Sequence, residues 1–146
     1  MKRITILVAL VVLAGLLLAP SALAAAVPAS TPFHGAWIGS DPPEPDGDGS
    51  IVHLSIGPGP RPAISFVDEY GTVCDNAGAS SPLFEARLSG YVDGDVLWAV
   101  FRSARCGGTP LGFLRGEIVA YEFDDQGTAT PADDTLWDGF VLWHRN

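Results

Sequence analysis

Alternating apolar residues, interrupted every few positions by glycine and proline, constrain the fold of this chain more than any other feature. In the stretch 51–56, apolar side chains occupy every second position, with His53 and Ser55 between them. This two-residue period is that of a β-strand with one buried face, and no long stretch has the 3.6-residue apolar period of an amphipathic helix. The pattern therefore predicts an all-β fold.

The expected strands are short and closely spaced. They cover residues 33–39, 51–56, 63–67, 72–74, 83–91, 96–106, 112–123 and 135–145. Asp93-Gly94 between two apolar runs is a strong hairpin signal, and successive strands joined by short connections usually pair with each other. The sequence thus predicts a single antiparallel meander barrel of about seven or eight strands, with a two-sheet β-sandwich as the alternative.

The first 24 residues have the features of a secretory signal peptide. Lys2 and Arg3 precede an apolar run over residues 6–19, and Ala22-Leu23-Ala24 supplies the small residues that signal peptidase accepts. We expect cleavage after Ala24, and cleavage after Ala26 is the alternative.

This leader predicts the organisation of the rest of the chain. A flexible lead-in is expected over residues 25–32 and one barrel domain over residues 33–146. No membrane span is expected in the mature chain, because its apolar runs are too short. The protein is therefore expected to be secreted or otherwise extracytoplasmic, in the cell envelope.

The mature chain is strongly acidic. Removing Lys2 and Arg3 leaves six of the eight basic residues against all 17 acidic ones, a net charge of −11. Such a chain has neither the basic patch of a nucleic-acid-binding protein nor the polybasic surface that binds anionic lipid. Its charge favours neutral or cationic partners.

Cys74 and Cys106 are the only cysteines in the chain. An even number of cysteines in an exported protein predicts a disulfide bond between them. Their spacing excludes a C-x-x-C redox site.

A short motif links the first and last expected strands. Gly35 and Trp37 form a G-x-W sequence near the start of the mature chain, and Arg145 lies at its end. In these positions the chain resembles the calycin group of barrels, which includes the lipocalins. The resemblance implies that Trp37 plugs one end of the barrel, that Arg145 lies across its ring, and that the barrel holds a small apolar ligand. The chain also resembles short secreted bacterial proteins of unknown function, and this resemblance implies no activity.

Five strand aromatics are candidates for lining such a ligand: Trp98, Phe101, Trp137, Phe140 and Trp143. The alternative is that they fill a packed core. Several expected strands are apolar on both faces, which predicts that the lead-in, a long loop or another subunit covers the outer face.

Metal and catalytic motifs are weak, and we expect no cofactor, metal or catalytic residue. The three histidines, His34, His53 and His144, lack the spacing of a zinc site. The acidic stretch 44–48 lacks the final acid of an EF-hand loop.

Acidic residues within strands are expected to be paired rather than catalytic. Glu85 is expected to pair with Arg87, and Asp138, if it faces inward, needs a partner such as Arg87 or Arg102. The sequence has no G-x-S-x-G motif. An enzymatic activity therefore stays open, but binding is favoured.

These observations favour an exported non-enzymatic binding protein, whose partner is an unknown small ligand or a protein. The first hypothesis is a protein that binds a small apolar ligand inside the barrel. The second is a protein-interaction module, such as a protease-inhibitor-like barrel, and the third is a structural cell-surface module with no discrete site. An empty interior of more than about 300 Å³ would favour the ligand, and a filled one would favour interaction.

Overall fold

The computed structural model describes residues 30–42 and 49–146 of the chain. The expected signal peptide, both cleavage positions, most of the lead-in and the acidic residues of the stretch 44–48 lie outside the described residues.

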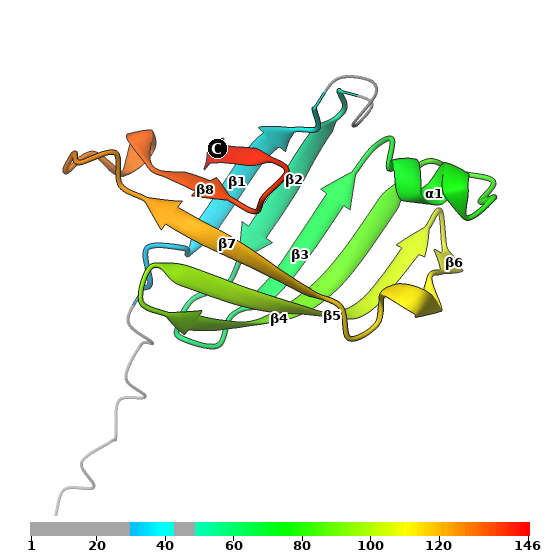
Figure 1. Cartoon of the computed structure of the whole chain (residues 1–146), viewed down its shortest axis with the longest axis horizontal. Helices are drawn as coiled ribbons and strands as arrows, with labels where there is room; N and C mark the ends of the chain where they lie inside the picture. The colour runs from blue at the N-terminus through cyan, green and yellow to red at the C-terminus, as the bar shows by residue number, and fades with distance from the viewer. Residues whose placement is uncertain (1–29, 43–48) are drawn as a thin grey trace, which may run out of the picture.

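The described chain forms a closed antiparallel barrel of eight strands (Figure 1). Around the barrel the order is β4-β3-β2-β1-β9-β8-β7-β5, and β5 pairs with β4 to close the ring. The strands of the ring are β1 Gly35–Ser40, β2 Ile51–Ile56, β3 Ala63–Asp68, β4 Phe84–Asp93, β5 Val96–Cys106, β7 Ile118–Asp124, β8 Thr135–Trp137 and β9 Leu142–Arg145. The short strand β6 (Thr109–Pro110) adds a hairpin to the end of β5.

The first and last strands join the two ends of the meander. Trp37 of β1 lies opposite Arg145 of β9, and Ile38 lies opposite His144. This pairing confirms the predicted single meander barrel, because a sandwich would have left these strands as edges. The fold is consistent with a calycin-like barrel.

Two expected strands have a different structure. Residues 72–74 were expected to be a strand, but they belong to the short helix α1 (Thr72–Asn76). The expected strand 112–123 begins with the 3-10 helix η1 (Gly112–Leu114) and becomes extended only at Ile118. Local backbone hydrogen bonds replace strand pairing in both segments: the amide of Cys74 donates to the carbonyl of Gly71, and the amide of Arg115 donates to the carbonyl of Gly112.

The expected last strand, 135–145, is in fact a hairpin. The strands β8 and β9 pair with each other, with Trp137 opposite Leu142, and residues 138–141 form the turn after the 3-10 helix η2 (Pro131–Asp133) and β8. Gly139 in the turn has a φ of 91°, a conformation that favours glycine. The turn changes which side chains share a face, so Trp143 points inward while Trp137 points outward.

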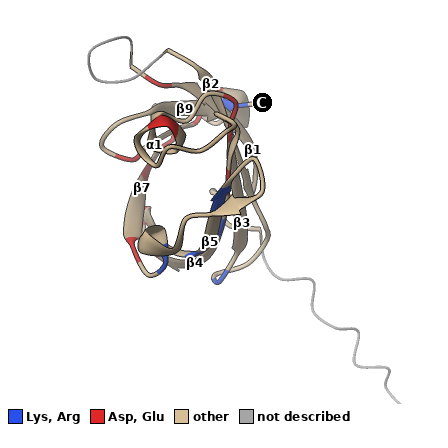
Figure 2. Cartoon of the chain, turned by 90° about the vertical axis from the view of Figure 1, so that its right-hand side faces the viewer, with Lys and Arg blue, Asp and Glu red and all other residues tan. Residues whose placement is uncertain are grey.

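Side chains fill the interior of the barrel. Apolar residues from every strand of the ring are buried, among them Trp37, Leu54, Ile64, Leu97 and Trp143. Figure 2 looks toward one end of the barrel, where α1 lies near the mouth and β3 and β7 form opposite walls.

A disulfide ties α1 to the barrel. Cys74 and Cys106 are bonded, with their Cα atoms 5.6 Å apart. Cys106 is the last residue of β5 and Cys74 lies inside α1, so the bond holds the helix against the end of this strand.

Candidate functional site

The G-x-W motif and Arg145 form one cluster at the beginning of β1. Trp37 is completely buried, and its indole Nε1 donates a hydrogen bond to the carbonyl of Phe33 over 2.8 Å. The guanidinium carbon of Arg145 lies 4.0 Å from the centroid of the Trp37 ring, which is a close cation–π contact.

Gly35 makes room for this contact. Its φ is 137°, and a Cβ atom at this position would lie 2.9 Å from Nη1 of Arg145. The backbone conformation at this position favours glycine, and the missing Cβ atom leaves room for the guanidinium group.

Arg145 also ties together segments far apart in sequence. Its Nη1 donates to the carbonyl of His34 over 2.6 Å, and its Nη2 donates to the carbonyl of Pro32 and to Oδ2 of Asp134, the latter at 3.1 Å. Asp134 is nearly buried, so this ion pair is shielded from solvent. These partners give the cluster a structural role, and they hold Pro32, which was expected in the flexible lead-in, against the barrel.

The structure does not bring the five candidate ligand-lining aromatics together. Trp143 is completely buried in the core and Phe101 packs partly against the core. Trp98, Trp137 and Phe140 are on the outside, with 46%, 43% and 46% of their surfaces exposed.

The interior around Trp143 is a network of edge-to-face ring contacts. Its ring centroid lies 5.7 Å from that of Phe66 and 6.3 Å from that of Tyr121, and Phe66 contacts Phe84 in the same way. Burial, together with the nearby Asp138 carboxylate, raises the pKa of Tyr121 far above its usual value. These aromatic side chains thus occupy part of the interior of the barrel.

Asp138 organises the β8–β9 turn. Its Oδ1 accepts hydrogen bonds from the backbone amides of Phe140 and Val141, at 2.9 and 2.7 Å. Its Oδ2 accepts a hydrogen bond from the indole Nε1 of Trp143 at 3.0 Å. The expected partners of this carboxylate, Arg87 and Arg102, are therefore replaced by an indole and two amides, because the turn aims Asp138 at its own hairpin.

Five exposed apolar residues form what we call the outer band: Tyr91, Trp98, Ile118, Trp137 and Leu142. Tyr91 lies directly opposite Trp98 on β4 and β5, and Trp137 lies directly opposite Leu142 on β8 and β9. The two pairs are linked through β7, whose Ala120 lies opposite Trp98. The outer band thus crosses five neighbouring strands of the barrel.

Acidic side chains are interspersed with the outer band. Glu122 lies directly opposite Trp137, Glu117 immediately precedes Ile118, and Asp93 follows two residues after Tyr91 on the same strand. All three are exposed. One cation lies at the edge, since the guanidinium carbon of Arg61 is 5.9 Å from the centroid of the Tyr91 ring.

The expected pair Glu85–Arg87 is replaced by another. Glu85 accepts two hydrogen bonds from Arg105, from Nε at 2.8 Å and from Nη2 at 3.0 Å. Sequence neighbours two apart share a face but lie on the same strand, whereas Arg105 lies directly across from Glu85 on β5. The hydrogen bonds from Arg105 are the main cause of the lowered pKa of Glu85.

The histidines lie apart from any cluster of metal ligands. His53 and His144 flank Ile38 on the outer face, one strand to each side. Within the described residues, no group of three or more His, Cys, Asp or Glu side chains is placed to hold a metal ion.

Sequence reasoning missed Tyr91, Ile118 and Leu142 of the outer band and Asp134 as partner of Arg145. Counting outward from a two-residue Asp93-Gly94 turn would place Tyr91 opposite Val96, whereas the turn is centred one residue later, on Gly94-Asp95, and places Tyr91 opposite Trp98. Asp138-Gly139 signals a turn near the end of the chain, but only the four-residue length of that turn, 138–141, pairs Trp137 with Leu142. The sequence did not predict the pairing of Asp134 with Arg145, because only the path of η2 and the loop before it brings the two side chains together.

Comparison with models of known protein families gives no match to this chain. Comparisons with curated protein sequences and with solved structures likewise give no match. Within residues 30–42 and 49–146, none of the helices has the length and apolar character needed to cross a membrane.

Proposed function

We propose that this chain is an exported, non-enzymatic, calycin-like binding protein that recognises a protein partner through the outer band. The single observation that carries the proposal is the exposure of Trp98 and Trp137, two large apolar side chains on neighbouring parts of one surface. Exposed tryptophan and tyrosine are enriched at protein interfaces, where they contribute much of the binding energy.

The filled interior supports recognition on the outside. Phe66 and Tyr121 each contact the ring of Trp143 edge to face in the interior of the barrel. A small apolar ligand would have to displace these rings, and opening a packed core costs several kcal/mol. The disulfide between Cys74 and Cys106 supports the extracytoplasmic part of the proposal, since such bonds persist in oxidising compartments.

The chemistry of the partner follows from the acids within the outer band. Glu122, Glu117 and Asp93 give this surface a negative potential between its apolar side chains. A partner segment that places Arg or Lys next to apolar residues would satisfy both properties of the surface. The net charge of −11, six basic against 17 acidic residues without Lys2 and Arg3, would steer such a cationic partner toward it.

Selection of a random peptide library on the immobilised disulfide-bonded protein tests this proposal. Peptides enriched on the wild-type protein should combine basic and apolar residues, and the doubly substituted Trp98→Ser, Trp137→Ser protein should not retain them. Tyr70→Ser is the matched control, because it removes a 62%-exposed aromatic outside the outer band. Equal retention by the double variant and the wild type would refute the proposal.

A second form of the proposal places a small apolar ligand at the mouth of the barrel. A pocket of about 270 Å³ lies beside α1, and its lining includes Phe66, Thr72, Phe84 and Phe140. A ligand there would leave the aromatic core intact. Titration with a lipophilic fluorescent dye should then reach saturation at one site, and Phe140→Ser should abolish that saturation.

A further inference from the structure

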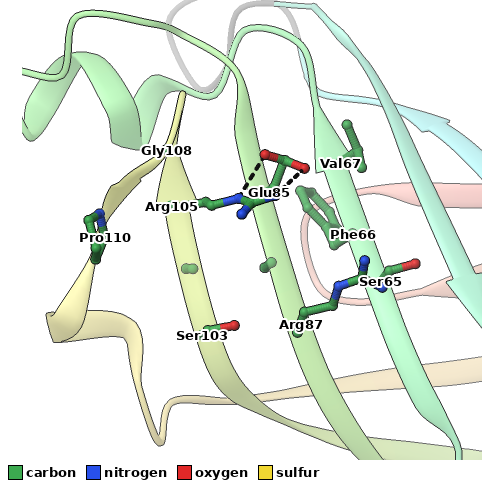
Figure 3. A pocket seen from close by; sticks show the side chains of 11 residues that line it. Ser65, Phe66, Val67, Glu85, Arg87, Ser103, Arg105, Gly108 and Pro110 are labelled. Atoms are coloured by element: carbon green, nitrogen blue, oxygen red, sulfur yellow. Dashed lines mark hydrogen bonds and ion pairs between the residues drawn. The ribbon is translucent and has the colours of Figure 1, made fainter.

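The outer face of β3, β4 and β5 carries a pocket that the outer band does not include (Figure 3). Its volume is about 440 Å³. Residues of β3, β4 and β5 form its floor, and Gly108 and Pro110, around the β6 hairpin, form one side. An irregularity in the sheet explains why a barrel has a hollow here: β5 carries one extra residue, Arg102, opposite the step from Arg87 to Leu88, and such bulges bend a strand.

Strand register places one arginine between two hydroxyl groups. Arg87 lies directly opposite Ser65 on β3 and directly opposite Ser103 on β5, and all three line the pocket. Figure 3 shows Ser65, Arg87 and Ser103 side by side across the three strands. Three neighbouring side chains thus present a guanidinium group and two hydroxyl groups to the same space.

The guanidinium group of Arg87 is available to a ligand. Among the residues that the structure describes, none forms a hydrogen bond or salt bridge with it. Arg105, in the next row of the pocket, is instead held by two hydrogen bonds from its guanidinium group to Glu85. Two arginines against one glutamate leave the pocket with one net positive charge in an otherwise acidic protein.

The other outward side chains of the lining are apolar: Val67 lies on β3 opposite Glu85, and Pro110 lies on β6. Phe66, Ala86 and Ala104 also line the pocket, but they alternate with its outward residues along their strands, so their side chains point into the core. A ligand that matches this lining has one planar anionic group and a compact apolar body. Arginine binds carboxylates through two parallel hydrogen bonds, and the serine hydroxyls can donate to the same oxygens.

We propose that this pocket binds a small monoanionic carboxylate with an apolar body, whose carboxylate is held by Arg87 between Ser65 and Ser103. The single net positive charge selects one negative charge, and the apolar walls select the body of the ligand. This site shares no residue with the outer band, so the proposed ligand does not depend on the proposed protein partner.

Titration of the disulfide-bonded protein with phenylacetate, followed by backbone amide chemical shifts, tests the proposal. Shifts are expected for the amides of β3, β4 and β5 around the pocket, with saturation at one site. Phenylacetamide, which has the same shape without the charge, is expected to bind at least tenfold more weakly. Equal affinity for the two compounds would overturn the proposal.

Two variants locate the site. Arg87→Gln is expected to weaken phenylacetate binding at least tenfold, and Ser103→Ala by a smaller factor. Arg115→Gln is the matched control, because it removes another exposed arginine outside the pocket and should leave the affinity unchanged. Unchanged binding by the Arg87 variant would overturn the proposal.

Inorganic phosphate at the same ionic strength distinguishes a carboxylate site from a general anion site. Phosphate is expected to bind at least tenfold more weakly than phenylacetate, because it has no apolar body. Phosphate binding as tight as that of phenylacetate, with the same shifts, would overturn the assignment to a carboxylate.

Discussion

The guanidinium group of Arg145 lies over the indole of Trp37, with its central carbon 4.0 Å from the ring centroid. The contact joins the first strand of the barrel to the last, and the same arginine donates hydrogen bonds to the carbonyls of Pro32 and His34. It therefore closes the ring of strands and anchors the chain that leads into it.

Removing the side chain of Trp37 should destabilise the barrel more than removing that of Arg145. Trp37→Ala removes a completely buried indole and should lower the free energy of unfolding by about 3–5 kcal/mol. Arg145→Ala should lower it by about 2 kcal/mol, because it also leaves the nearly buried Asp134 carboxylate without its ion pair. Urea unfolding followed by fluorescence measures both. Arg115→Ala, an exposed control, should change the value by less than about 0.5 kcal/mol.

Asp138 should stabilise the β8–β9 hairpin through its three hydrogen bonds to Phe140, Val141 and Trp143. Asp138→Ala should lower the free energy of unfolding by about 2–3 kcal/mol, since the indole N–H of Trp143 loses its acceptor. Asp138→Asn keeps a carbonyl oxygen and should cost less. Equal losses for the two variants in urea unfolding would contradict this role of the carboxylate oxygens.

Reduction of the Cys74–Cys106 bond should release α1 from the end of β5. The bond spans a sequence separation of 32 residues, and the chain-entropy model assigns such a loop about 3–4 kcal/mol of stabilisation. Cys74→Ala with Cys106→Ala should lower the thermal midpoint accordingly, measured by circular dichroism. Hydrogen exchange should be accelerated most in α1, and an unchanged exchange pattern there would argue against the anchoring role.

Tyr121 should make the fold sensitive to alkaline pH. Its pKa is raised in the folded state, mainly by burial, so the folded state retains a proton that the unfolded state releases above about pH 10. Stability is therefore complete below that pH and falls as the pH rises beyond it. Urea unfolding at successive pH values should show this fall in the wild type and a smaller one in Tyr121→Phe. Identical pH profiles for the two proteins would contradict it.

The four tryptophans should divide into two classes by accessibility. Trp37 and Trp143 are completely buried, whereas Trp98 and Trp137 are 46% and 43% exposed. Acrylamide should therefore quench part of the fluorescence readily and the remainder hardly at all. The double variant Trp98→Phe, Trp137→Phe should lose the readily quenched fraction, and persistence of that fraction would contradict the assignment of these residues to the outside.

Much of the architecture was predictable from local pattern. The two-residue period located β2 and β3, because a strand with one buried face must alternate. Asp93-Gly94 located the β4–β5 hairpin, since Gly94 has a positive φ that glycine adopts without strain. The pairing of the two cysteines followed from their number alone.

The same local signal was present and overlooked at the end of the chain. Asp138-Gly139 divides the apolar run 135–145 into β8 and β9, and this turn decides that Trp143 is buried while Trp137 is exposed. A face assigned by parity is valid only as far as the strand is continuous. One missed turn therefore changed the assignment of the candidate ligand-lining residues.

The sequence by itself determined the class of the fold, its disulfide and its strongly acidic surface, because these depend on residue types and on periods of a few residues. Only the tertiary structure decided which distant side chains meet. The register between strands places Arg105, rather than Arg87, on Glu85, and leaves Arg87 between Ser65 and Ser103. Register is fixed by the packing of all strands around one core, so no local stretch of sequence contains it.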